Sequence, residues 1–306
     1  MVYHSPVVWI CFSVAILGLM ALDLGVFNRR SHVLSFKEAT AWSAGWISLA
    51  LVFGLFLLLR EGTRPALEYY TGYLIELSLS VDNLFIFILV FQYFAVPAAL
   101  QPRVLKWGIV GAVIMRALMI GTGAVLLHRF EWAIYLFGGI VILTGIKMFR
   151  MEEMRVEPEK NPVVRLAQRF LPFSSAYDGQ RFFSRSLSGW KATPLLLVLL
   201  VIETTDLVFA VDSIPAIFAV TRDPFIVYTS NVFAILGLRS LFFILASMMD
   251  RFEYLKPAVA MILLFVGFKM VLAKWVHIPI GISLAIVLAT LVGGVVLSLR
   301  KGSAAQ

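Results

Sequence analysis

Long apolar segments recur along the whole chain, and they restrict its fold more than any other feature. About 20 consecutive apolar residues cross a bilayer as one α-helix. Of the 306 residues 60% are hydrophobic and only 14% are charged, whereas soluble domains carry about 25% charged residues. The pattern predicts an all-α polytopic membrane protein with about nine transmembrane helices, at 7–27, 41–59, 72–95, 107–127, 132–149, 193–220, 226–249, 255–273 and 278–299.

We expect residues 1–306 to form a single membrane domain, because a helical bundle in lipid can use the whole chain as one unit. The only long polar stretch is the basic loop 150–192, which contains three prolines. Within it, apolar residues at helical spacing between 163 and 171 alternate with Arg165 and Arg169. This pattern predicts a short amphipathic helix lying on anionic lipid.

The distribution of Lys and Arg between the two sides of the membrane predicts the orientation. One side carries only five cations outside the expected spans, and the other side carries all the rest. Positive residues gather on the cytoplasmic side. We therefore expect a periplasmic N-terminus, with the C-terminus and the loop 150–192 in the cytoplasm. The net charge of +8 is then a consequence of membrane topology and does not indicate nucleic-acid binding. The five cations are Arg60, Arg64, Arg129, Arg222 and Lys274.

Two acidic segments resemble each other. Glu76–Asn83 in the third expected span and Asp206–Ser213 in the sixth both place an acid six residues before the Asp of a Val-Asp pair. In each case the next span has one central arginine, Arg116 and then Arg239. The same order of features in two places indicates a duplicated unit.

The following span of each unit carries a Gly-X-Lys-Met motif, at 145–148 and at 267–270. Their lysines lie near span ends, where long cationic side chains snorkel to the interface. A unit of three helices is odd-numbered, so its second copy enters the membrane from the opposite side. The sequence therefore predicts two inverted repeats, at about 72–149 and 193–273, whose interface would hold a site near the bilayer midplane.

Besides Asp23, which lies toward the cytoplasmic end of the first expected span, five acids fall inside the expected spans. Each ionised acid at a helix centre costs about 2.5–3.5 kcal/mol on insertion scales. A single acid could be a structural partner of Arg116 or Arg239, but two arginines leave the set with a formal charge of −3. Protons, a metal cation or both must neutralise it. The five are Glu76, Asp82, Glu203, Asp206 and Asp212.

The side chains beside these acids are oxygen donors, which suit a hard cation such as magnesium, manganese or calcium. All four histidines lie at or beyond span ends, and Cys11 is the only cysteine, so a zinc or copper(I) site is not expected. We assign Arg116 and Arg239 to charge balancing; the alternative is that they bind an anionic substrate, which the acids would repel. The candidate metal ligands are Glu76, Asp82, Asn83, Glu203, Asp206, Asp212 and Ser213.

Helix geometry limits what each acid pair can do. Six residues of a regular helix turn 600°, so the two acids of each motif point about 120° apart. Either the helix unwinds between them, or the second acid faces a different partner. Pro215, three residues after Asp212, favours a break, and broken helices coordinate ions in transporters.

These motifs resemble the signature of the TerC/Alx family of bacterial membrane proteins, most closely its nine-span Alx branch. The resemblance rests on Glu76–Asn83 and on 202–216, with further matches at 23–27, 161–165 and 231–239. It implies a location in the bacterial inner membrane, manganese(II) export, and for some relatives metal supply to exported proteins. It also implies links to tellurite resistance, alkaline induction and redox modulation. The five acids are where the family's metal site would fall.

We therefore expect a secondary exporter of a divalent metal ion, most of all Mn(II), in exchange for protons, and not an enzyme. The expected partners are the metal ion and the lipid bilayer, with no nucleic acid and no covalently bound cofactor. The alternative is a membrane factor for metal delivery, redox modulation or tellurite (oxyanion) resistance without transport of its own. Metal selectivity, direction, coupling ion, stoichiometry and oligomeric state do not follow from the sequence.

Overall fold

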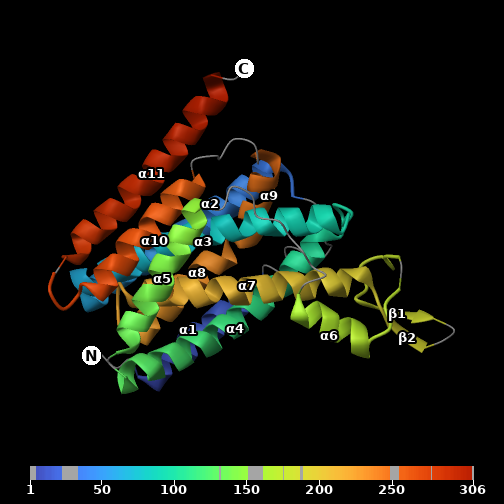
Figure 1. Cartoon of the computed structure of the whole chain (residues 1–306), viewed down its shortest axis with the longest axis horizontal. Coiled ribbons are helices and arrows are strands. Elements are labelled where there is room, and N and C mark those ends of the chain that lie inside the picture. The colour runs from blue at the N-terminus through green and yellow to red at the C-terminus, as the bar shows by residue number, and fades with distance from the viewer. Residues whose placement is uncertain are drawn as a thin grey trace.

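The computed structural model of the chain describes residues 5–22, 34–130, 132–150, 161–174, 176–186, 189–248, 255–276 and 278–304. In these residues it has eleven helices and one two-stranded hairpin (Figure 1). The helices are α1 Pro6–Ala21, α2 Phe36–Glu61, α3 Thr63–Tyr93, α4 Gln101–Arg129, α5 Ala133–Arg150, α6 Pro162–Phe170, α7 Pro194–Phe218, α8 Pro224–Leu236, α9 Leu238–Met248, α10 Leu255–Val271 and α11 Ile280–Ala304, and the strands are β1 Phe183–Ser186 and β2 Gly189–Ala192.

The helices confirm a polytopic α-helical membrane protein. Five of the described helices are long and apolar enough to cross a bilayer alone, namely α2, α3, α4, α7 and α11. The pair α8 and α9, bent by 46°, makes a sixth candidate. Shorter apolar helices at Pro6–Ala21, Ala133–Phe149 and Pro257–Val271 lie where three more spans are expected. Nine spans therefore remain a prediction, since these three fall short of a full crossing.

Local sequence explains where several helices begin. Proline lies in the first turn of α1, α4, α6, α7 and α8. Its fixed φ suits a helix there, and its missing N–H costs nothing because first-turn N–H groups have no hydrogen-bond acceptor within the helix. Helix α2 instead begins with a capping box, in which Ser35 accepts a hydrogen bond from the Glu38 N–H and Glu38 accepts one from the Ser35 N–H.

The predicted break in the acidic helices is wrong. Helix α3 is continuous through Glu76 and Asp82, and α7 is continuous through Asp206 and Asp212 with Pro215 inside it. Pro215 lies within the last turn of α7, so little helix follows the bond it removes, and membrane helices tolerate such prolines. The break occurs in the next span, at Gly237 between α8 and α9, where a glycine permits a sharp bend.

Helix α3 forms the centre of the bundle. It contacts α2, α7, α8, α9, α10 and α11, and most of its apolar stretch is buried inside the protein. In Figure 1 it runs between α2 and α8, with α7 and α4 on one side and α10 and α11 on the other. Polar side chains on α3 are therefore enclosed by protein and not by lipid.

Helices α5 and α10 pack together more extensively than any other pair (Figure 1). A Cβ added at Gly138 of α5 would lie 3.3 Å from the Gly267 carbonyl oxygen, and one at Gly267 would lie 3.2 Å from the Gly138 carbonyl oxygen. Seven residues further along α5, a Cβ at Gly145 would lie 3.2 Å from the carbonyl oxygen of Ala260 on α10. The two helices thus run antiparallel, with their backbones in contact at glycines.

We expect Gly267→Ala to destabilise the protein by about 1–3 kcal/mol, the usual cost of overpacking a filled interior. The new Cβ would lie 2.7 Å from Ile142 Cγ1 and 3.0 Å from the Ile142 backbone nitrogen, so α5 and α10 must separate. Gly139→Ala is the matched control, because a Cβ there meets nothing within 4 Å. Equilibrium unfolding in mixed micelles measures both; equal stability of the two variants would contradict the close contact.

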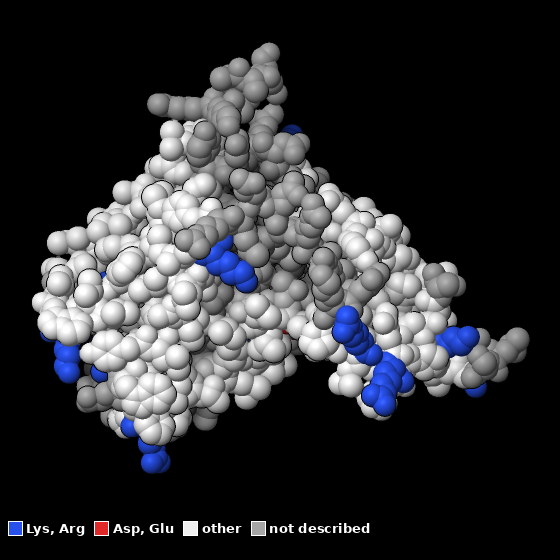
Figure 2. Space-filling model, viewed as in Figure 1, with Lys and Arg blue, Asp and Glu red and all other residues white. Residues whose placement is uncertain are grey.

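The basic loop contains more structure than the expected short helix. Helix α6 confirms that helix, with Val164 buried and Arg165 and Arg169 exposed. The hairpin β1–β2, with two strands of four residues each, follows it and was not expected, while the all-α class of the fold is confirmed by the eleven described helices. Figure 2 shows Lys and Arg side chains over this end of the molecule, while most of the surface over the neighbouring helices is uncharged. Its contact with anionic lipid remains a prediction.

Candidate functional site

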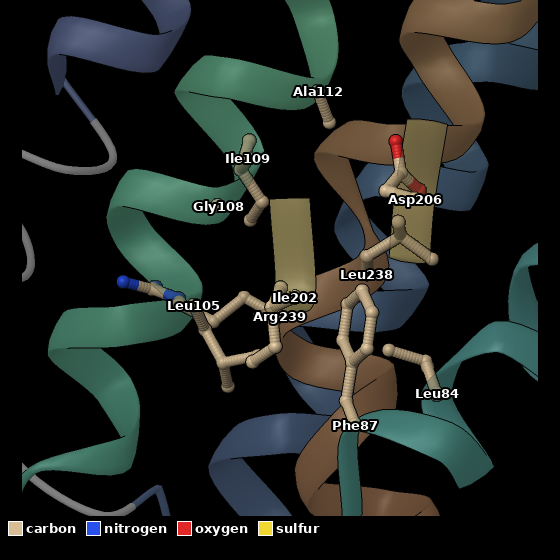
Figure 3. Close-up of a pocket in the computed structure, with 10 residues that line it drawn as sticks. All are labelled: Leu84, Phe87, Leu105, Gly108, Ile109, Ala112, Ile202, Asp206, Leu238 and Arg239. Carbon is tan, nitrogen blue, oxygen red and sulfur yellow. The ribbon is translucent and has the colours of Figure 1, made fainter. Parts of the chain in front are cut away.

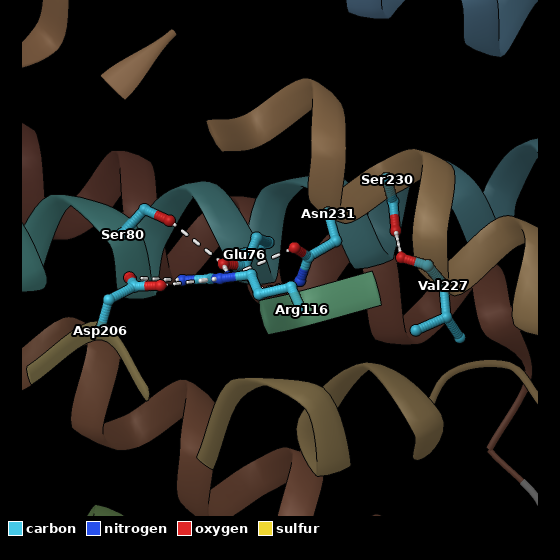
Figure 4. Close-up of polar contacts among 7 residues, drawn as sticks. All are labelled: Glu76, Ser80, Arg116, Asp206, Val227, Ser230 and Asn231. Carbon is cyan, nitrogen blue, oxygen red and sulfur yellow. Dashed lines mark hydrogen bonds and ion pairs between the residues drawn. The ribbon is translucent and has the colours of Figure 1, made fainter. Parts of the chain in front are cut away.

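Arg116 on α4 lies at the centre of a fully buried group of charges. Its Nη2 donates a hydrogen bond to Asp206 Oδ1 at 3.0 Å, and its Nε donates to Asp206 Oδ2 at 3.3 Å. Its Nη1 forms an ion pair with Glu76 Oε1. The three residues come from α4, α7 and α3, so both acidic motifs meet on one guanidinium (Figure 4).

Two neutral side chains complete the hydrogen bonds of this group. Asn231 on α8 donates from Nδ2 to Glu76 Oε2 at 2.9 Å and accepts at Oδ1 from Arg116 Nη1 at 3.4 Å. Ser80 donates to Glu76 Oε1 at 3.2 Å from the next turn of α3. The sequence interpretation did not assign Asn231 a role, although an amide in the same apolar span as Arg239 was a usable signal.

The central group carries a net negative charge. Glu76 and Asp206 contribute two negative charges, and Arg116 contributes one positive charge. The exposed fraction is 0% for the side chains of Glu76 and Arg116 and 4% for that of Asp206. A charge far from water is costly to leave unpaired, so the group favours a further cation or a proton.

Glu203 adds a further carboxylate next to the central group. It precedes Asp206 by one helical turn on α7 and is close enough for the two acids to repel each other. Its carboxylate packs directly against Gly111 of α4, where any Cβ would overlap both carboxylate oxygens. The absence of a side chain at Gly111 therefore creates the space in which Glu203 lies.

A small cavity lies against Asp206 (Figure 3). It offers about 20 Å³ to water-sized occupants, and roughly 10–15 Å³ suffices for one water molecule. Arg239 on α9 also lines it, with its guanidinium turned away from Asp206 in Figure 3, and the other lining side chains are apolar. The apolar and small lining residues are Leu84, Phe87, Leu105, Gly108, Ile109, Ala112, Ile202 and Leu238.

The remaining candidate ligands fall into two groups. Asn83 and Ser213 are buried, and neither Asn83 Nδ2 nor Ser213 Oγ has a hydrogen-bond partner among the described residues. Asp82 and Asp212 belong to α3 and α7, but their side chains lie outside what the structure describes. Among the described residues no three Asp, Glu, His or Cys side chains converge on one point. Of the predicted metal ligands, Glu76 and Asp206 are the ones that contact Arg116 among the described residues.

The sequence places the chain in a family. A sequence model of the integral membrane protein TerC family matches residues 61–305, which include every site residue named above. The chain belongs to the TerC family of integral membrane proteins. The resemblance found in the acidic motifs is thereby confirmed.

Close relatives of this TerC-family protein cover nearly its whole length. A membrane protein of Myxococcus xanthus, STKORF319, is 50% identical over 297 residues, which make up 97% of this chain and 93% of its own. An Escherichia coli K12 protein provisionally named membrane-bound redox modulator Alx is 46% identical over 297 residues, 94% of this chain and 92% of its own. A Rickettsia felis membrane protein is 41% identical over 293 residues. No solved structure matches the chain.

Proposed function

We propose that this TerC-family protein is a secondary exporter of a divalent metal cation, Mn(II) in the first place, and that it exchanges the metal for protons. One observation carries the proposal: Glu76 and Asp206, from the two halves of the chain, converge on one buried guanidinium and leave a net negative charge. Carboxylate oxygens suit a hard divalent cation. The choice of manganese rests on the family resemblance.

Arg116 holds the position that a cation would take between the two carboxylates. An arriving divalent ion competes with the guanidinium for Glu76 and Asp206, and protons compete with both. Because a proton or a metal ion neutralises the same oxygens, their binding is mutually exclusive, and this exclusion is what an exchanger needs. The Ser213 hydroxyl oxygen, which is buried without a hydrogen-bond partner among the described residues, supports the proposal, since it is an oxygen donor that directly follows Asp212 of the predicted metal site.

The α5–α10 contact supports the proposed inverted repeat. Aligning the two Gly-X-Lys-Met motifs pairs Gly145 with Gly267. The same offset between the two units pairs Gly138 with Ala260. The contact of Gly138 with Gly267 then has a counterpart in the contact of Gly145 with Ala260. A two-fold axis in the membrane plane relates antiparallel helices in this reciprocal way. With the proposed topology, the N-terminus is periplasmic and the basic loop is cytoplasmic.

The proposal is tested by Mn(II) flux into proteoliposomes under an imposed proton gradient. We expect Glu76→Gln and Asp206→Asn each to reduce flux to that of empty liposomes. A neutral amide lacks the negative charge for which the metal ion and the proton compete. Asp178→Asn is the matched control, since Asp178 lies outside the spanning helices with 44% of its side chain exposed; it should transport like the wild type.

Two results would contradict the proposal. Full proton-driven flux in either Glu76→Gln or Asp206→Asn would remove these carboxylates from the transport cycle. Mn(II) binding by the wild type without any flux would favour the alternative, a membrane factor for metal delivery, redox modulation or tellurite resistance without transport of its own. Mg(II) and Ca(II) measured in parallel determine the selectivity.

A further inference from the structure

Helix α6 lies beside the first turns of α7, at the end where this expected span begins (Figure 1). Val164, the buried residue of α6, belongs to the same buried apolar cluster as Leu195 and Val198 of α7. Helix α7 is apolar from its first turn and long enough to cross a bilayer. Its contact with α7 therefore holds α6 near the boundary between bilayer and water.

Helix α6 also presents apolar side chains outward. Val163, Leu166 and Phe170 are spaced three and four residues apart, so they lie on one face of the helix. All three are exposed, and the exposed fraction of Phe170 reaches 72%. Arg169 lies beside this face and is exposed as well. Exposed apolar residues flanked by cations are typical of helices that lie in a membrane interface.

The hairpin adds a second exposed face of the same character, which the sequence did not predict. Arg185 on β1 pairs with Trp190 on β2, and Phe183 precedes Arg185 by two residues, so the three side chains lie on one face. All three are exposed, Trp190 to 67%. Strand β2 ends at Ala192, and α7 begins at Pro194. This face therefore lies within a few residues of the expected membrane boundary.

Two contacts fix this part of the basic loop to the helix bundle. The Tyr177 hydroxyl donates a hydrogen bond to the Phe94 carbonyl oxygen at 2.7 Å, directly after the end of α3. Arg103, in the first turn of α4, places its guanidinium carbon 5.6 Å from the centre of the Phe182 ring, within the range of a cation–π interaction. The exposed faces of α6 and the hairpin are thus held in place relative to α3, α4 and α7.

The charge of this region is complementary to anionic lipid. Residues 161–193 contain five Lys or Arg against one acid, Asp178. Figure 2 shows Lys and Arg side chains over α6 and the hairpin. Tryptophan is enriched where membrane helices meet water, and cations next to the bilayer attract anionic headgroups. Exposed aromatic residues and cations on one face, next to the start of a span, favour a lipid surface over other acidic partners.

We propose that α6 and the hairpin form one lipid-binding surface for anionic phospholipid. Arg185 and Arg169 bind the phosphate groups, while Phe183, Trp190 and Phe170 lie among the headgroups and the first acyl carbons. Under the proposed topology the lipid belongs to the cytoplasmic leaflet. The expectation of lipid contact for the short helix is thereby extended to the hairpin. This inference does not depend on transport, because a metal-delivery factor with the same structure would bind lipid equally.

Lipid binding to the purified full-length protein tests the role of the cations. Native mass spectrometry gives the affinities for phosphatidylglycerol and phosphatidylcholine, and we expect the wild type to prefer phosphatidylglycerol. Arg169→Gln with Arg185→Gln should lower this preference by about 25-fold, because each cation near an anionic surface contributes about fivefold. Arg60→Gln with Arg129→Gln is the matched control: both arginines are exposed at the opposite helix ends, and their loss should leave the preference unchanged.

A spin label at position 190 tests the contact with lipid directly. Cys11 is the only cysteine, so Cys11→Ser provides the background for labelling Trp190→Cys in nanodiscs that contain phosphatidylglycerol. Asp178→Cys is the matched control, since Asp178 is exposed in the same loop but off the hairpin face. Oxygen, which dissolves in lipid, and a water-soluble nickel chelate each relax an accessible label. We expect the label at 190 to respond mainly to oxygen and the label at 178 mainly to nickel.

Three results would overturn the proposal. A label at 190 that responds mainly to the nickel chelate places the hairpin face in water. A response to neither agent means that protein covers this face, as a second copy of the chain would. An equal loss of lipid preference in the Arg60 and Arg129 control reduces the effect of the cations to net charge. None of these results bears on Mn(II) flux, so the lipid-binding surface and the proposed function can fail separately.

Discussion

Replacing Arg116 by methionine is expected to destabilise the protein by about 3–5 kcal/mol, the usual cost of removing one member of a buried ion pair. The substitution leaves Glu76 and Asp206 facing each other, with side chains that are 0% and 4% exposed and no guanidinium between them. The free energy of unfolding, measured in mixed micelles of increasing denaturing detergent, gives the size of the effect. Arg181→Met is the control: Arg181 pairs with Asp178 at 3.9 Å on the surface, and such pairs contribute less than about 1 kcal/mol.

The triple variant Arg116→Met, Glu76→Gln, Asp206→Asn distinguishes two causes of the expected loss of stability, the lost packing of Arg116 and the unpaired charges of the two acids. Replacing a whole buried ion pair by neutral groups is often neutral or stabilising, so the triple variant should recover most of the stability lost by Arg116→Met. If Arg116→Met were no less stable than Arg181→Met, the central group would not depend on the guanidinium. The exchange mechanism proposed above, in which the guanidinium stands in for a cation, would then have no basis.

The class of fold and the identity of the central residues could be predicted from the sequence, because both follow from the apolar environment of the bilayer. Charged residues in apolar spans are costly, so Glu76, Arg116 and Asp206 were identifiable from hydropathy alone. Their repeated order along the chain suggested that the two acidic helices meet. The contact of both acids with Arg116 could not be derived from the sequence. A period of 3.6 residues shows which face of each helix is buried, but not which helix packs against that face.

Three features of the structure escaped the sequence interpretation, each for a local reason. Pro215 suggested a break in α7, but its place near the helix end leaves α7 continuous, and Gly237 bends the next span instead. The hairpin β1–β2 lies in a stretch whose charges indicated a loop. Glu68 stood before the expected start of its span, where an acid needs no explanation; α3 begins earlier, at Thr63, and encloses it.

The difference between Lys147 and Lys269 shows what repetition in sequence leaves undetermined. The two lysines occupy matching positions of matching motifs, yet one is exposed and the other is bonded to Ser283. Matching motifs do not require matching surroundings, because each lysine contacts whichever helices pack around it. The sequence predicts two units, and only the packing of the helices determines what each lysine contacts.

Gly111→Ala is expected to weaken Mn(II) binding by about 10–100-fold, the range seen when a residue that orients a metal ligand is changed. A Cβ at Gly111 would overlap both carboxylate oxygens of Glu203, so the carboxylate must rotate away from its position beside Asp206. Gly121→Ala on the same helix is the control, because a Cβ there meets nothing within 4 Å. Calorimetric titration of Mn(II) into each purified variant measures the affinity.

The same substitution also separates a ligand role of Glu203 from a packing role. Replacing glycine by alanine inside a helix stabilises it by about 0.5–1 kcal/mol when space permits, so Gly121→Ala should be slightly more stable than the wild type and bind Mn(II) equally well. If Gly111→Ala behaves like Gly121→Ala in both affinity and stability, the Glu203 carboxylate moves without consequence and is not part of the metal site. If Gly111→Ala loses stability but keeps the affinity, the close approach of α4 and α7 is structural. Loss of affinity in a variant that stays folded assigns Glu203 to the metal site, together with Glu76 and Asp206.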